Sequence, residues 1–284
     1  MQRPARKLRD QLVHVARGSG EDVRLREVLP ERLAVERVHE FGIRGRRLPV
    51  DVADAQAHAV AAAVPVGELV GDDVVGVGDR AADFARIVGA GGSVVGTDLS
   101  HAMIHTSKSR HSTSGLPLEF HVADALNQPF SDESFDRIRT ERVLLYIKEI
   151  PEVLREFRRL LKDDGILVVA DVDFDAMVIA HKDKRLTRKI VEYISDNFPS
   201  GRIATELFGH FKDFGFRDVV VRPISYICTL DFTKRLCGGV IQTGVDAGVF
   251  AASEISEWWS TLEKDDRDGK FLAVVQGFIV AGKK

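Results

Sequence analysis

Two aspartates follow short apolar runs in the middle of the chain and have the spacing of cofactor ligands. Asp98 follows the run SVVGT, and Asp124 follows FHVA. Carboxylates at neighbouring strand ends can accept hydrogen bonds from ribose hydroxyls or an adenine amino group. Gly76 and Gly78 precede Asp98, where the lack of side chains lets backbone N–H groups approach a ligand. The spacing predicts a nucleotide-like cofactor across strand ends.

Each of these residues also has an ordinary structural explanation. Gly76 and Gly78 suit a tight turn from a strand into a helix, and Asp124 suits a turn closed by its own side chain. The run Gly76-Val77-Gly78-Asp79-Arg80-Ala81 also fits the Gly-x-Gly-x-x-Ala pattern of NAD-binding enzymes, with Asp98 on the ribose. A structural role, a dinucleotide and other nucleotide cofactors therefore all stay open at this point.

Strands and helices are expected to alternate around these residues. Ser100 is the expected N-cap of the helix that follows Asp98. Because parallel strands need crossover connections that cover both faces of a sheet, alternation predicts a doubly wound, mostly parallel α/β fold. The periodicity predicts strands at 74–75, 93–97, 119–122, 135–139 and 166–172, and helices at 51–64, 79–88, 100–110 and 150–161.

The pattern changes beyond Asp173. Two helical stripes, at 186–198 and 207–214, precede long strand signals at 218–230 and 271–281. Between these strands lies a helical insert at about 231–265 that includes Trp258 and Trp259. We therefore expect one main domain over 69–284 with the insert as a cap, preceded by a basic, helical segment over 1–68.

Composition excludes several classes of protein. The 284 residues are 44% apolar and 29% charged with a net charge of -3, which is typical of a globular chain. Arginine alternates with glutamate in the first fifty residues and no aromatic residues are interleaved, so nucleic-acid binding is not expected. The two cysteines have no zinc-site spacing, and no apolar run is long enough to span a membrane. We expect a cytoplasmic protein without a metal, and no oligomer is predicted.

The N-terminal third has an unusual amino-acid composition. No lysine occurs between Lys7 and Lys108, although arginine is frequent there. GC-rich codon usage would explain this, and so would a shifted reading frame before about residue 76.

Three segments resemble one enzyme family. GGSVVGTDLSHAMI, VADALNQPFSDESFDRIRTERVL and VLREFRRLLKDDGILVVAD are similar to the class I S-adenosylmethionine-dependent methyltransferases, especially the ubiquinone/menaquinone C-methyltransferase-like, type 11 group. The resemblance covers roughly 72–173. It implies a Rossmann-like, seven-stranded sheet with an antiparallel last strand, and an N-terminal segment that serves as a cofactor lid.

The resemblance also implies a set of cofactor residues. The family's acidic residue and Gly-x-Gly-x-Gly loop align with 72–78, where Val74 stands in place of the first glycine. The methionine part of S-adenosylmethionine would lie on this loop, the ribose on Asp98 and the adenosine near the next strand end. The implied ligands are Asp72, Gly76, Gly78, Asp98, Leu99, Met103, Asp124 and Ala125.

Residues for the acceptor are less sharply marked. Glu141, Tyr146 and Trp259 are the candidates for an acceptor pocket, and Asp173 and His181 join the first two as candidate bases. Methyl transfer from a sulfonium requires alignment and desolvation rather than an acid for the leaving group. No residue pair has the pattern of a catalytic dyad, so the catalytic residue stays unknown.

The sequence therefore predicts S-adenosylmethionine-dependent C- or O-methylation of a small, hydrophobic acceptor. Two alternatives remain. Val74 in the glycine loop is compatible with a non-catalytic or cofactor-impaired protein on the same fold, and the Gly-x-Gly-x-x-Ala run with an NAD-dependent oxidoreductase.

Overall fold

The computed structural model describes residues 42–43, 46–47, 58–62 and 78–284, the first three of these ranges by backbone alone. The chain divides into two compact units, Met1–Asp51 and Val52–Lys284. The described strands of the first unit, β1 (Gly42–Ile43) and β2 (Arg46–Arg47), pair antiparallel. The predicted boundary after residue 68 lies outside the described residues and stays a prediction.

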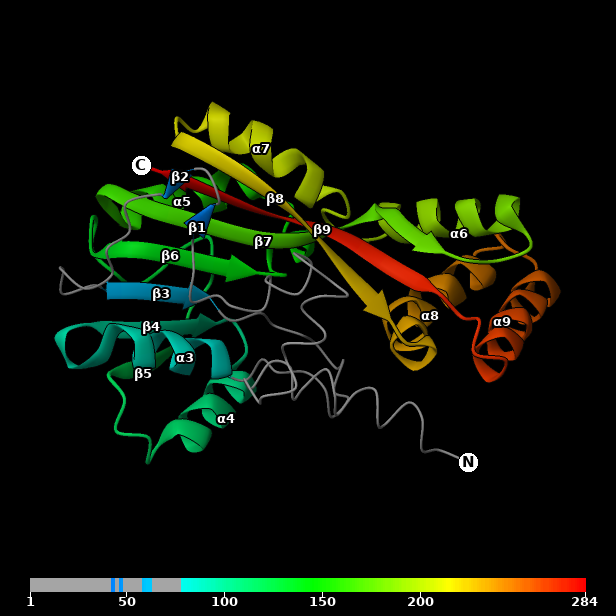
Figure 1. Ribbon diagram of the computed structural model, residues 1–284, viewed down its shortest axis with the longest axis horizontal. Helices are drawn as coiled ribbons and strands as arrows, with labels where there is room; N and C mark the ends of the chain where they lie inside the picture. The colour runs from blue at the N-terminus through cyan, green and yellow to red at the C-terminus, as the bar shows by residue number, and fades with distance from the viewer. Residues whose placement is uncertain (1–41, 44–45, 48–57, 63–77) are drawn as a thin grey trace. The chain divides into compact units, whose positions relative to one another are not determined.

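The second unit is built on a seven-stranded sheet with the order β5-β4-β3-β6-β7-β9-β8 (Figure 1). The five strands from β5 to β7 pair in parallel, and β9 runs antiparallel to both of its neighbours. Strands are added on one side of β3 and then on the other, so β3 marks the switch point where ligands bind in such sheets. The strands are β3 (His58–Ala62), β4 (Ser93–Asp98), β5 (Leu118–Val122), β6 (Phe135–Glu141), β7 (Leu161–Ile179), β8 (Arg217–Cys228) and β9 (Ala273–Lys283).

Helices cover both faces of this sheet, as the doubly wound class requires. Val94 belongs to an apolar cluster with helices α3 and α4, whereas its neighbour Val95 packs against the main core. Successive strand residues point to opposite faces, so both faces of β4 are buried. The α/β class is confirmed. The helices are α3 (Asp79–Val88), α4 (His101–His111), α5 (Ile150–Leu160), α6 (Lys184–Asp196), α7 (Ile203–Asp213), α8 (Leu230–Asp246) and α9 (Ala252–Arg267), with short 3-10 turns η2 (Gly89–Gly91) and η3 (Leu144–Tyr146).

One predicted element is wrong. The alanine-rich stretch 51–64 was expected to be a helix, but residues 58–62 form the central strand β3. This strand pairs with β4 through Ala59 and Val94 and with β6 through Val60 and Ile138. Backbone pairing on both sides therefore outweighs the helix propensity of alanine. The strand predicted at 74–75 lies outside the described residues.

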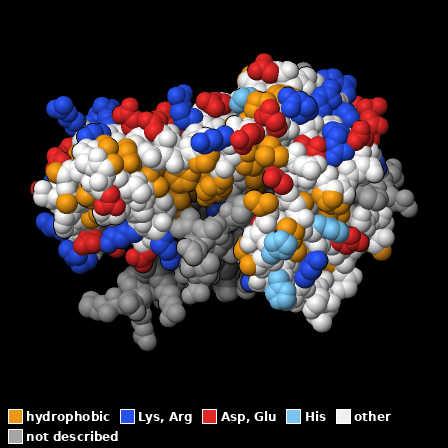
Figure 2. Space-filling model, turned by 180° about the vertical axis from the view of Figure 1, so that it is seen from behind, with side chains coloured by type: hydrophobic (Ala, Val, Ile, Leu, Met, Phe, Trp, Pro, Cys, Tyr) orange, Lys and Arg blue, Asp and Glu red, His pale blue; other side chains and the backbone are white. Residues whose placement is uncertain are grey.

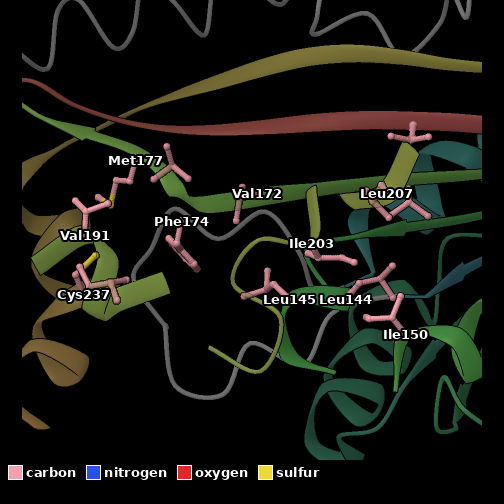
Figure 3. Packing of buried hydrophobic residues seen from close by; sticks show 14 of the residues in the cluster. Leu144, Leu145, Ile150, Val172, Phe174, Met177, Val191, Ile203, Leu207 and Cys237 are labelled. Carbon is pink, nitrogen blue, oxygen red and sulfur yellow. The ribbon is translucent and has the colours of Figure 1, made fainter. Parts of the chain in front are cut away.

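Helices α6, α8 and α9 form a cap at one end of the domain (Figure 1). The segment between β8 and β9 supplies α8 and α9, and α6 packs against α8 and β7. Trp258 of α9 is fully buried and donates its Nε1–H to Thr187 Oγ1 of α6 at 2.9 Å. Figure 3 shows one apolar core that runs from Leu144 and Ile203 near the sheet to Val191 and Cys237 in the cap.

Candidate cofactor and acceptor site

Asp98 lies at the carboxyl end of β4 with one carboxylate oxygen satisfied and the other free to bind a ligand. Its side chain is buried, and its Oδ1 accepts a hydrogen bond from the N–H of Ser100 at 2.7 Å. Its Oδ2 is also buried but has no hydrogen-bond partner among the described residues. Burial raises the pKa of Asp98 to about 6, although the Ser100 N–H partly opposes this shift. A buried acceptor without a partner is unfavourable, so this atom fits a ribose hydroxyl donor.

The turn before α3 demands glycine at position 78. Gly78 caps α3 with φ of 77°, a left-handed conformation, and is buried. A Cβ at this position would lie 2.7 Å from the ring of Phe120 and 3.1 Å from Ser107. Both the backbone conformation and the close packing exclude a side chain. Gly78 therefore shapes the turn, while Asp72, Gly76 and Val74 lie outside the described residues.

The remaining predicted cofactor residues lie at two adjacent strand ends. Asp98 pairs in register with Val122, and the N–H of Ala123 donates to the Asp98 carbonyl at 3.0 Å. Leu99 is 58% exposed, and Met103 in the first turn of α4 donates its N–H to Ser100 Oγ at 3.3 Å. The expected N-cap role of Ser100 is confirmed.

Asp124 also lies at this edge, in a turn of its own. Its side chain is exposed, and its Oδ1 accepts the N–H of Leu126 at 3.0 Å. Gln128 donates its side-chain amide to the Asp124 carbonyl at 2.9 Å, while Ala125 is half-buried against the main core. The turn role of Asp124 is thus present in the structure.

Glu141 at the end of β6 pairs with an arginine two residues before it. Arg139 Nη2 lies 2.5 Å from Glu141 Oε2, and both side chains are mostly buried. Burial alone would raise the pKa of Glu141, but the charges of Arg139, Arg142 and Arg80 and the Arg139 hydrogen bond lower it below its ordinary value. Glu141 is therefore an ionised structural partner, a poor fit to a general base.

Tyr146 and Trp259 lie in different parts of the domain. Tyr146 ends η3, half-buried, with its ring 5.9 Å from that of Phe198. Trp259 is half-buried in α9, where its ring contacts Trp258 at 4.6 Å and lies 5.9 Å from Lys234 Nζ. Tyr146 follows the carboxyl end of β6, whereas the contacts of Trp259 all lie within the cap.

The other candidate bases are held by structural contacts. Asp173 is buried and accepts from Thr205 Oγ1 at 2.7 Å and from the Ala176 N–H at 3.2 Å. His181 Nδ1 accepts the N–H of Asp183 at 2.9 Å, beside the ring of Trp258. Neither arrangement leaves a base facing the strand ends.

Sequence reasoning missed Asp171, another buried carboxyl of this region. It lies in β7, where its Oδ2 accepts the N–H of Leu144 at 2.9 Å and its Oδ1 accepts that of Val172 at 3.0 Å. Burial raises its pKa to about 7, against the opposing effect of these backbone N–H groups. An acidic residue inside the apolar run ILVVADVDF was the available signal.

The strand order, with β9 antiparallel between β7 and β8, is the order expected of the class I methyltransferase fold. Residues 73–169 match the family model described as a methyltransferase domain, of the type 11 family. This match bears out the predicted resemblance over these residues and agrees with S-adenosylmethionine as the predicted cofactor.

Curated relatives agree over part of their length. The methyltransferase GfsG of Streptomyces halstedii is 32% identical over 146 residues, which are 48% of this chain and 51% of that protein. The ubiquinone/menaquinone biosynthesis C-methyltransferase UbiE of Bordetella avium is 34% identical over 128 residues, 43% of this chain and 50% of that protein. The chain thus spans about half the length of these relatives.

Solved structures show the same fold. A Bacillus halodurans protein described as a candidate methyltransferase superposes with a TM-score of 0.54 at 16% identity, over 81% of this chain and 93% of that protein. Within the part of the chain that the structure describes, no helix has the length and apolar character needed to cross a membrane. The same residues contain no cluster of metal-ligating side chains.

Proposed function

We propose that this protein transfers a methyl group from S-adenosylmethionine to carbon or oxygen of a small, hydrophobic acceptor. The observation that carries the proposal is the buried Oδ2 of Asp98 at the end of β4, which has no partner among the described residues. The strand order of the sheet, which is typical of the fold, agrees with it. Bound there, S-adenosylmethionine would supply an electrophilic methyl on a positively charged sulfur.

The residues of the chain would hold and orient this cofactor. Asp98 would accept the ribose hydroxyls, Leu99 would lie against the adenine with its exposed side chain, and Ala125 would line the adenine edge beside Asp124. Asp72, Gly76 and the first turn of α4 at Met103 complete the proposed set. The site needs no acid for the leaving group, because the sulfonium leaves as a neutral thioether. Its contacts would serve to align the acceptor with the methyl group.

The apolar surface beside the cap supports a hydrophobic acceptor. Figure 2 shows hydrophobic side chains gathered between the cap and the rest of the domain. Excluding water there would remove hydration of the sulfonium and favour transfer, since the positive charge on sulfur is lost as the S–CH3 bond breaks. Methylation at carbon is the reaction named for the Bordetella avium relative, which favours carbon or oxygen acceptors here.

Calorimetric titration with S-adenosylmethionine and S-adenosylhomocysteine tests the proposal. We expect micromolar binding that Asp98→Ala weakens by about tenfold or more, because a charged hydrogen-bond acceptor is lost. Asp213→Ala, which removes an exposed aspartate of α7, serves as the matched control and should bind normally.

The alternatives give different results in the same experiment. A folded protein that binds neither ligand would support the non-catalytic reading suggested by Val74 in the glycine loop. Tighter binding of NAD than of S-adenosylhomocysteine would replace the proposal with an oxidoreductase.

A further inference from the structure

Arg142 occupies an unusual backbone conformation at the carboxyl end of β6. Its φ is 54°, in the left-handed region, and its N–H donates to the Ala170 carbonyl of β7 at 2.8 Å. The other described non-glycine residues with positive φ, Glu133, Asp164 and Asp218, are exposed, whereas Arg142 is half-buried. Such backbone strain is concentrated at ligand-binding sites. This conformation turns the chain at the strand end, next to central strand β3.

The guanidinium of Arg142 lies within electrostatic reach of Glu141 but forms no salt bridge with it. Its Nε is buried and has no hydrogen-bond partner among the described residues. The adjacent carboxylate, Glu141, is taken by Arg139, and Arg142 forms no ion pair in the described part of the chain. A buried N–H donor without an acceptor is unfavourable, so the Nε–H of Arg142 fits a hydrogen-bond acceptor supplied by a ligand.

Two tyrosines on separate elements lie within electrostatic reach of Arg142. Burial raises the pKa of both Tyr146 in η3 and Tyr226 in β8, and the charge of Arg142 opposes the rise at each. Arg142 is therefore within electrostatic reach of two phenols that come from different elements. Beside Tyr146, the ring of Phe198 stacks on Phe174 at 4.3 Å. The surroundings fit a flat, apolar molecule.

We propose that Arg142 binds a carboxylate of the acceptor, so that the substrates of this enzyme are apolar or aromatic acids. The inference rests on the proposed methyl transfer, because it names the acceptor class of the same site. The Nε–H and one Nη–H of a guanidinium form a fork that matches the two oxygens of a carboxylate. Held this way at the end of β6, the acid would neutralise Arg142 and present its apolar body to the aromatic side chains.

A matched pair of probes tests the inference. We would titrate 2-naphthoate and its neutral analogue 2-naphthamide into the full chain, with and without saturating S-adenosylhomocysteine. The wild type should bind the naphthoate at least tenfold more tightly, and Arg142→Gln should abolish this preference while leaving the affinity for S-adenosylhomocysteine unchanged. Arg155→Gln removes an exposed arginine of α5 and should keep the preference.

The outcomes separate this inference from the proposed function. Equal affinity for the two probes, no binding of either, or an unchanged preference in Arg142→Gln would overturn the carboxylate site. Failure of S-adenosylhomocysteine to bind would instead overturn the methyltransferase proposal. If Arg142→Gln does not fold, Arg142→Lys keeps the charge but loses the fork, and should weaken naphthoate binding at least threefold.

Discussion

Gly78 shows how one residue can set the geometry of a cofactor turn. Its left-handed backbone begins α3, and the ring of Phe120 fills the space where a side chain would be. The same small residue therefore satisfies a backbone requirement and a packing requirement. Neither is visible from the spacing of glycines in the sequence.

Replacing this glycine should be destabilising. We expect Gly78→Ala to lower the free energy of unfolding by about 1 to 3 kcal/mol, through strained φ and the overlap with Phe120. Gly209→Ala is the matched control, because Gly209 lies in helix α7 with open space around it and should gain up to about 1 kcal/mol. Thermal unfolding of both variants measures the two changes in stability. Equal changes for Gly78→Ala and Gly209→Ala would contradict the explanation.

The sequence predicted Asp98 but could not predict the state of Arg142. Asp98 follows an apolar run twenty residues after Gly78, a linear spacing that a strand, turn and helix translate directly into position. Glu141 pairs with Arg139, two residues before it, rather than with its neighbour Arg142. Which arginine pairs with Glu141 depends on the pleating of β6 and on the turn at Arg142, where φ is 54°. Both depend on the tertiary structure.

At the scale of elements, helices and strands with a strong pattern were predicted well. The helix at 79–88 and the stripe at 150–161 correspond to α3 and α5, since their apolar spacing allows one answer. The stretch at 51–64 is compatible with either a helix or a strand, because its alanines and valines have no clear period. Pairing with β4 and β6 decided in favour of a strand, and this information lies elsewhere in the chain.

The contact between α6 and α9 depends on one buried hydrogen bond. Thr187→Val keeps the side-chain shape but leaves the indole N–H of Trp258 without its acceptor. We expect a loss of about 1 to 3 kcal/mol in the free energy of unfolding. Thr106→Val in α4, where the hydroxyl is exposed and bonds within its own helix, should change stability by less. Chemical denaturation compares them, and similar losses would argue against the cap contact.

For the whole molecule, Asp171 links stability to pH. Burial raises its pKa to about 7 from 3.8, so the folded state retains the proton that the unfolded state releases. Its contribution is fully present below about pH 4 and is lost as pH rises through about 7, with a slope of up to about 1.4 kcal/mol per pH unit. Asp171→Asn should remove this slope from the pH dependence of the free energy of unfolding.

Denaturation of both proteins between pH 4 and 8 provides the measurement. Asp213→Asn, at an exposed aspartate, should follow the wild type. Parallel curves for the wild type and Asp171→Asn would show that the carboxyl of Asp171 is ionised in the folded protein across this range.

Strands β7 and β9 extend from the sheet into the cap, with one irregularity in their pairing between Asp173 and Val178. Near the sheet Val169 pairs with Val280, and at the cap end Ile179 pairs with Ala273. Both ends of these strands lie in the same apolar core as Trp258 and Ile138. The cap therefore cannot be exchanged as a unit. Replacing it with a relative's cap would cut through strands that it shares with the sheet, so a change of acceptor specificity requires substitutions within the existing cap.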